Sequence, residues 1–86
     1  MELITVIDAK YMHEYKISLK FNDGVIGVVD LEKYLDGEIF EPLKNSEYFK
    51  KFTLDSWTIG WDNGADFAPE FLHDLTIKMN GLCYAA

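Results

Sequence analysis

The clearest pattern in the chain is the alternation of apolar and polar residues over positions 15–21. Every second side chain of this stretch is apolar, as expected of a β-strand with one buried face. Runs rich in β-branched residues at 2–8 and 25–29 indicate two further strands. Residues 9–14 lose the pattern and are expected to connect the first two strands. The Asn-Asp-Gly sequence at 22–24 indicates that the second and third strands form a hairpin.

This hairpin has two possible registers, which differ in the side chains that face the core. A two-residue loop (23–24) would pair Phe21 with Ile26, whereas a three-residue loop (22–24) would pair Phe21 with Val25. We favour the three-residue loop, because its first two residues suit a type I turn and its glycine suits the left-handed position that closes the turn. The core face would then carry Ile17, Leu19, Phe21, Val25 and Val29.

The same register places Ile26 and Val28 on the face of the sheet that points away from the core. An exposed apolar pair is unusual on an acidic protein, and Ile4 or Val6 could extend it. We therefore expect Ile26 and Val28 to be candidate interface residues, either for a partner or for a homodimer.

The last helix of the chain has explicit boundary signals. Pro69 suits the first helical position, Glu70 places negative charge in the first turn, and Asn80-Gly81 ends the helix. His73 faces away from the apolar stripe of this helix, so we expect it to be solvated. The stripe consists of Phe71, Leu72, Leu75 and Met79.

Shorter elements precede this helix. Two short helices are expected at 31–35 and 46–51, and two short strands at 53–55 and 56–61. Trp57, Ile59 and Trp61 would share one face of the last strand and anchor the second half of the core. The whole chain, residues 1–86, is therefore expected to be one α+β domain in the order β-β-β-α-α-β-β-α. Its C-terminal helix would pack on a small antiparallel or mixed sheet.

Composition and charge narrow the class of protein. The apolar share of 49% is ample for a core, which argues against a disordered chain. Eight basic residues against fifteen acidic ones leave a net charge of −7, which disfavours direct nucleic-acid binding and binding to anionic membranes.

The chain shows no signal-peptide or membrane-spanning pattern, so we expect a cytoplasmic protein. The single cysteine, Cys83, excludes an intramolecular disulfide and is expected to be a packed thiol.

The most polar cluster is the segment Trp61-Asp62-Asn63-Gly64-Ala65-Asp66. Its two carboxylates, Asp62 and Asp66, could in principle hold a divalent cation or act as acid and base. A calcium loop needs a glutamate at its twelfth position, which here is His73. We favour a structural interpretation in which Asn63-Gly64 forms a left-handed turn and Asp66 binds nearby backbone amides. We expect no catalytic residues, metal or cofactor, and treat Trp61, Asp62, Asn63, Gly64 and Asp66 as the candidate functional motif.

Several segments combine in a recognisable order: Leu19-Lys20-Phe21-Asn22-Asp23-Gly24, Val29-Asp30-Leu31, Phe40-Glu41-Pro42-Leu43, Trp61-Asp62-Asn63-Gly64-Ala65-Asp66 and Pro69-Glu70. This combination resembles the small bacterial family called domain of unknown function 2442, over nearly the whole chain. The resemblance implies an α+β domain like the N-terminal domain of a Nitrosomonas protein. It also implies a frequent gene neighbour, a small protein of the domain of unknown function 4160 type, and hence a toxin–antitoxin-like pair.

Two functions remain open at this point. The first is a non-enzymatic protein-interaction domain, the partner-binding member of such a pair, which the acidic charge and the many Tyr and Trp residues favour. The alternative is a small ligand-binding domain or enzyme that uses the segment from Asp62 to Asp66. This alternative predicts a pocket beside the start of the last helix.

Overall fold

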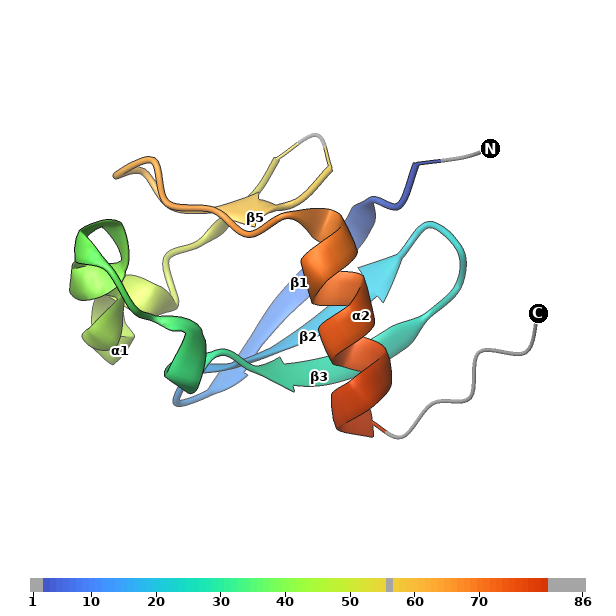
Figure 1. Cartoon of the computed structure of the whole chain (residues 1–86), viewed down its shortest axis with the longest axis horizontal. Coiled ribbons are helices and arrows are strands. Elements are labelled where there is room, and N and C mark those ends of the chain that lie inside the picture. The colour runs from blue at the N-terminus through green and yellow to red at the C-terminus, as the bar shows by residue number, and fades with distance from the viewer. Residues whose placement is uncertain (1–2, 56, 81–86) are drawn as a thin grey trace.

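The computed structural model describes residues 3–55 and 57–80, which form an α+β fold (Figure 1). Its elements are β1 (Val6–His13), β2 (Lys16–Phe21), β3 (Ile26–Asp30), the 3₁₀ helices η1 (Glu32–Tyr34) and η2 (Glu38–Lys44), α1 (Ser46–Phe49), β4 (Thr53–Leu54), β5 (Ile59–Gly60) and α2 (Pro69–Asn80). The predicted fold class is confirmed. Cys83 and the expected helix stop at Gly81 lie outside the described residues.

The first three strands form an antiparallel sheet in the order β1-β2-β3. The prediction that residues 9–14 connect two strands is wrong, because β1 extends to His13. Register shifts between Val6 and Asp8, and again between Tyr11 and His13, interrupt the alternation that would have revealed this strand. The turn to β2 is made at Glu14, which has a positive φ of 51°.

The hairpin between β2 and β3 has the three-residue loop that the sequence favours. Ile17 pairs with Val29, and the Phe21 amide donates to the Val25 carbonyl over 2.9 Å. Gly24 has a φ of 94°, the left-handed conformation expected at the end of this loop. Among the predicted core residues of the hairpin, Val25 is half-buried and Ile17, Leu19, Phe21 and Val29 are fully buried.

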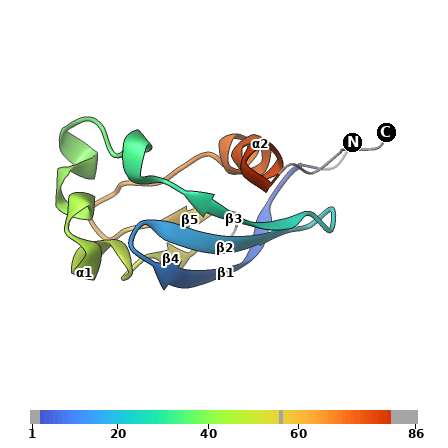
Figure 2. The same ribbon diagram turned by 90° about the horizontal axis from the view of Figure 1, so that it is seen from below.

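Helix α2 lies across one face of the sheet and packs against β3 (Figures 1 and 2). Its predicted start at Pro69 is confirmed, but the buried stripe differs from the predicted one: Leu72, Leu75 and Thr76 are buried, whereas Phe71 and Met79 are exposed. Thr76 can be buried because its hydroxyl donates to the Leu72 carbonyl over 2.7 Å within the helix.

The second half of the core is built around aromatic side chains from short elements. Ile59 and Trp61 are buried as expected, but Trp57 is 57% exposed and Thr58 is buried in its place. The expectation that Trp57 shares their face is wrong, because only Ile59–Gly60 is paired as a strand and Trp57 lies before it. There the Trp57 carbonyl accepts the Val6 amide at 2.8 Å, which ties this segment to the start of β1.

Candidate functional site

The polar segment from Trp61 to Asp66 forms a tight turn between β5 and α2. The Trp61 amide donates to the Ala65 carbonyl over 2.8 Å, and the Gly64 amide donates back to the Trp61 carbonyl over 3.1 Å. Gly64 has a φ of 93°, a conformation that side-chain-bearing residues rarely adopt. The turn is therefore set by hydrogen bonds within the segment and by the absence of a side chain at one position.

Side chains of this turn also fasten it to distant parts of the fold. The Trp61 indole N–H donates to the Phe49 carbonyl over 2.8 Å, and the Asn63 amide group donates to the Ile39 carbonyl over 2.8 Å. The Asn63 side-chain oxygen accepts the Ala65 amide at 3.0 Å. The turn thus joins α1 and η2 to the segment that leads into α2, which supports a structural role for these residues. Of the predicted left-handed pair Asn63-Gly64, only Gly64 has a positive φ.

The two carboxylates of the segment have different environments. Asp62 accepts a hydrogen bond from the Tyr48 hydroxyl, and this bond is the main cause that raises the pKa of Tyr48 above its ordinary value. Asp66 is exposed, and its backbone forms an isolated bridge with Gly60. Within residues 3–55 and 57–80, no three His, Cys, Asp or Glu side chains come together as metal ligands would.

His73 is not the solvated helix residue that the sequence indicated. Its Nε2 lies 2.7 Å from Asp23 Oδ2, and its ring packs edge-on against Phe21 with the centroids 5.0 Å apart. The two paired side chains are fifty positions apart in the chain, so helix periodicity carried no signal for this contact. The pair joins α2 to the loop of the hairpin.

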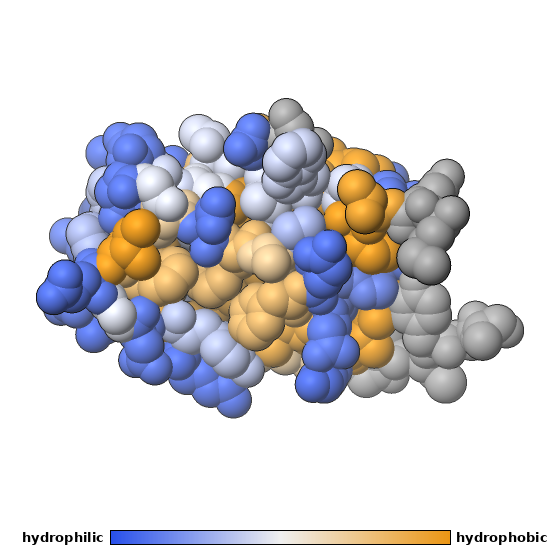
Figure 3. Space-filling model, turned by 45° about the horizontal axis from the view of Figure 1, so that its top comes forward, coloured by the Kyte–Doolittle hydropathy of each residue, from blue (hydrophilic) through white to orange (hydrophobic). Residues whose placement is uncertain are grey.

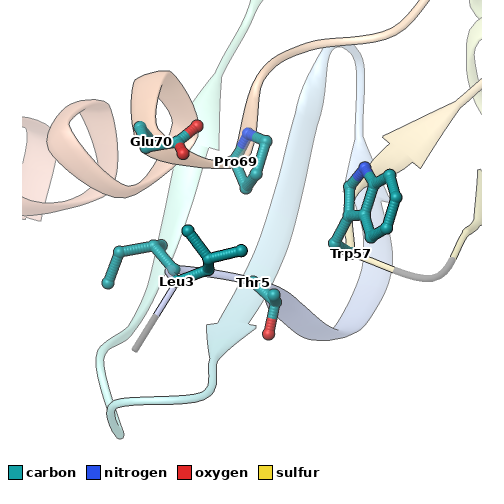
Figure 4. Close-up of a pocket in the computed structure, with 6 residues that line it drawn as sticks. Leu3, Thr5, Trp57, Pro69 and Glu70 are labelled. Carbon is teal, nitrogen blue, oxygen red and sulfur yellow. The ribbon is translucent and has the colours of Figure 1, made fainter. Parts of the chain in front are cut away.

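A shallow pocket of about 270 Å³ lies at the start of α2 (Figure 4). We call it the α2 pocket; its lining consists of Leu3, Ile4, Thr5, Trp57, Pro69 and Glu70. A pocket beside the start of this helix was expected from the ligand-binding hypothesis, but Asp62 and Asp66 are not part of its lining. The sequence did not indicate Leu3 and Trp57 as site residues. Leu3 lies in a run of β-branched residues, and Trp57 is a large aromatic residue; both features are as typical of a buried position as of an exposed one.

Four aromatic rings form a row that links η1, the first turn of α2 and η2, which we call the aromatic band: Tyr34, Phe71, Phe67 and Phe40. The ring centroid of Phe67 lies 5.8 Å from that of Phe71 and 5.0 Å from that of Phe40, and both pairs of rings are stacked. Phe67 is buried, but Phe71 is 38% exposed and the other two rings are half-buried. Figure 3 shows one face of the molecule, on which pale-orange apolar groups gather with hydrophilic residues around them.

The family model for "Protein of unknown function (DUF2442)" matches residues 6–77. The chain belongs to the DUF2442 family. This match covers the three-stranded sheet, the turn from Trp61 to Asp66 and most of α2. Neither the curated proteins nor the solved structures contain a match to the chain.

The matched region of this DUF2442 chain contains the aromatic band and part of the α2 pocket. Trp57, Pro69 and Glu70 lie inside the match, whereas Leu3, Ile4 and Thr5 precede it.

In the part of the chain that the structure describes, no helix is long and apolar enough to cross a bilayer.

The predicted interface pair of this DUF2442 chain lies on the sheet face opposite α2. Ile26 is 54% exposed, as the hairpin register requires, while Val28 is half-buried. The suggestion that Val6 extends this patch is wrong: Val6 is only 2% exposed and pairs with Phe21. Ile4, the other residue suggested for this patch, is half-buried, packs against the core and lines the α2 pocket instead.

Proposed function

We propose that this DUF2442 chain is a non-enzymatic protein-interaction domain, the partner-binding member of a toxin–antitoxin-like or other two-protein regulatory pair. The observation that carries the proposal is the aromatic band. Large aromatic side chains at a partly exposed surface are typical anchors of protein interfaces, because they bury much apolar area at a low entropic cost. Phe71 supplies the most exposed ring of the band.

Charge around the band indicates the chemistry of the partner. Glu38, Asp66 and Glu70 are exposed; Asp66 and Glu70 directly precede the band residues Phe67 and Phe71, and Glu38 lies two positions before Phe40. None of the three forms an ion pair with another described residue. Unpaired carboxylates around an apolar centre favour association with a basic surface and disfavour an acidic one.

The partner that we propose is the small neighbouring-gene protein of the domain of unknown function 4160 type. The support for this partner is the family to which the chain belongs, together with the acidic face described above. The proposal requires no direct contact with nucleic acid, which a net charge of −7 disfavours.

Co-expression with the tagged neighbouring protein tests the proposal. We expect the two chains to co-purify at about 50 mM salt and the complex to weaken at about 500 mM, because salt screens exposed charges. The substitution Phe71→Ser should lower the affinity at least tenfold, whereas Ile26→Ser removes an exposed apolar side chain from the other face and should leave it unchanged.

Two outcomes would contradict this proposal. If the chain elutes without the neighbouring protein even at low salt, the pair does not exist. If Ile26→Ser disrupts an assembly and Phe71→Ser does not, the sheet face is the contact surface, as a homodimer through Ile26 and Val28 would require.

A further inference from the structure

We propose that the α2 pocket receives one long basic side chain, an arginine or a lysine, of the protein partner. This inference rests on the proposed function and identifies the residue class that the pocket recognises. Interfaces commonly place a few anchor side chains in pockets of the opposite surface, and arginine is among the commonest anchors.

The size of the pocket fits a single side chain better than a metabolite. Its volume of about 270 Å³ lies at the lower edge of the range of about 300–1,000 Å³ that is typical of small-molecule sites. The pocket is also shallow, and the N-terminal segment with Leu3, the indole of Trp57 and the ring of Pro69 border it (Figure 4). A shallow, narrow site of this kind can bury the stem of one side chain that enters from a docked surface.

The apolar walls account for the length of the expected side chain. Leu3 is 77% exposed and Trp57 is 57% exposed, so both leave large apolar surfaces open to the solvent. The methylene stem of an arginine or lysine can cover such surfaces while its charged end stays at the rim. A cation can also gain from the face of an indole, which carries partial negative charge.

Glu70 gives the pocket its preference for a positive charge. It is the only ionisable residue in the lining, and it is exposed and forms no ion pair among the described residues. Its place in the first turn of α2 also stabilises the helix, because a carboxylate complements the helix dipole there. That role does not explain why Leu3 and Trp57 remain exposed beside it, whereas a bound basic side chain would cover both.

The test uses the co-expressed complex and compares two glutamates. Glu70→Gln should weaken binding of the tagged neighbouring protein at least tenfold, and Glu70→Lys at least a hundredfold. The matched controls are Glu38→Gln and Glu38→Lys, since Glu38 is exposed, forms no ion pair among the described residues and lies at the start of η2, outside the pocket lining. Glu38 contributes to the acidic charge near the aromatic band but does not line the pocket, so its variants should weaken binding at least threefold less than the matching Glu70 variants. Thermal unfolding of each variant alone separates loss of binding from loss of fold.

Charge exchange then identifies the bound side chain. Each arginine and lysine of the partner is replaced in turn by glutamate, and binding of each partner variant to the Glu70→Lys chain is measured. One of these replacements should restore binding. If the complex forms but Glu70 and Glu38 variants behave alike, or if Trp57→Ala weakens it while the Glu70 variants do not, the basic-side-chain proposal is wrong and the proposed function stands. If the unaltered chain forms no complex, the proposed function itself fails.

Discussion

Gly64 shows how a single residue can determine the conformation of the polar turn. Its φ of 93° lies where a Cβ atom is strained, although a Cβ built there would meet only Ile39 Cδ1, at 4.0 Å. There is therefore room for a methyl group at position 64. A larger residue would destabilise the fold only because it disfavours the left-handed backbone conformation.

Replacing Gly64 with alanine should lower the free energy of unfolding by about 1–2 kcal/mol, because alanine is penalised in the left-handed region. Urea unfolding monitored by tryptophan fluorescence measures the change. Gly64→Asn is the control and should cost less, since asparagine tolerates this region better. An alanine variant as stable as the original chain would show that the turn does not depend on glycine at this position.

The Tyr48–Asp62 hydrogen bond gives a second test at the level of single residues. The bond from the Tyr48 hydroxyl raises the pKa of Tyr48 above the ordinary value of 10.0. Because the pKa in the folded chain is raised, the contact stabilises the fold fully below pH 10.0, and this contribution is lost as the pH rises through the folded-state pKa.

We expect Asp62→Asn to lower the pKa of Tyr48 toward its ordinary value, because the substitution removes the charged acceptor. Tyrosine ring resonances followed by NMR against pH measure this directly. Asp66→Asn removes the other carboxylate of the segment and should leave Tyr48 unaffected. An unchanged Tyr48 titration in Asp62→Asn would mean that the hydrogen bond does not form in solution.

At the scale of elements, the end of α2 completes the edge of the three-stranded sheet. The Asn80 side chain donates to the Val28 carbonyl over 2.9 Å and accepts the Val28 amide at 3.3 Å, while Met79 Sδ accepts the Asp30 amide at 3.3 Å. Strand β3 is an edge strand, and unpaired edge groups invite association with other chains. The helix therefore supplies hydrogen-bond partners for the backbone groups of Val28 and Asp30, which would otherwise bond to water or to another strand.

Gly27 permits this close approach of α2 to β3. A Cβ built on Gly27 would lie 2.6 Å from Asn80 Nδ2 and 2.8 Å from Thr76 Cγ2. We expect Gly27→Ala to cost about 1–3 kcal/mol of unfolding free energy, because the helix must shift away from the strand.

A double-mutant cycle separates this clash from a general effect of alanine in the strand. Thr76→Ser removes the methyl group and retains the hydroxyl that binds Leu72. In that background Gly27→Ala should cost less. Equal costs in both backgrounds, measured by chemical denaturation, would show that the contact with Thr76 does not limit the packing of α2.

At the scale of the whole molecule, apolar and acidic groups share one surface. The aromatic band and the α2 pocket both include residues of the first turn of α2, Phe71 in the band and Glu70 in the pocket lining. The net charge of −7 adds a long-range attraction for basic partners, which accelerates association mainly at low salt. This combination supports the proposals of a basic partner surface and of a basic side chain in the α2 pocket.

The sequence by itself determined the elements whose signals are local. The alternation over residues 15–21 and the Asn-Asp-Gly turn were sufficient for β2 and the hairpin register, because strand period and turn geometry act within a few residues. Pro69 likewise marked the start of α2. The turn around Gly64 was predictable for the same reason, since its φ depends on the residue itself.

Only the tertiary structure decided which apolar and polar side chains remain at the surface. Whether Trp57 is buried depends on where β5 begins, and the partner of His73 lies fifty positions away at Asp23. The register shifts of β1 follow from its pairing with β2. Such contacts join segments that are distant in the chain, so no local period reports them. The aromatic band and the α2 pocket exist only once those segments have been brought together.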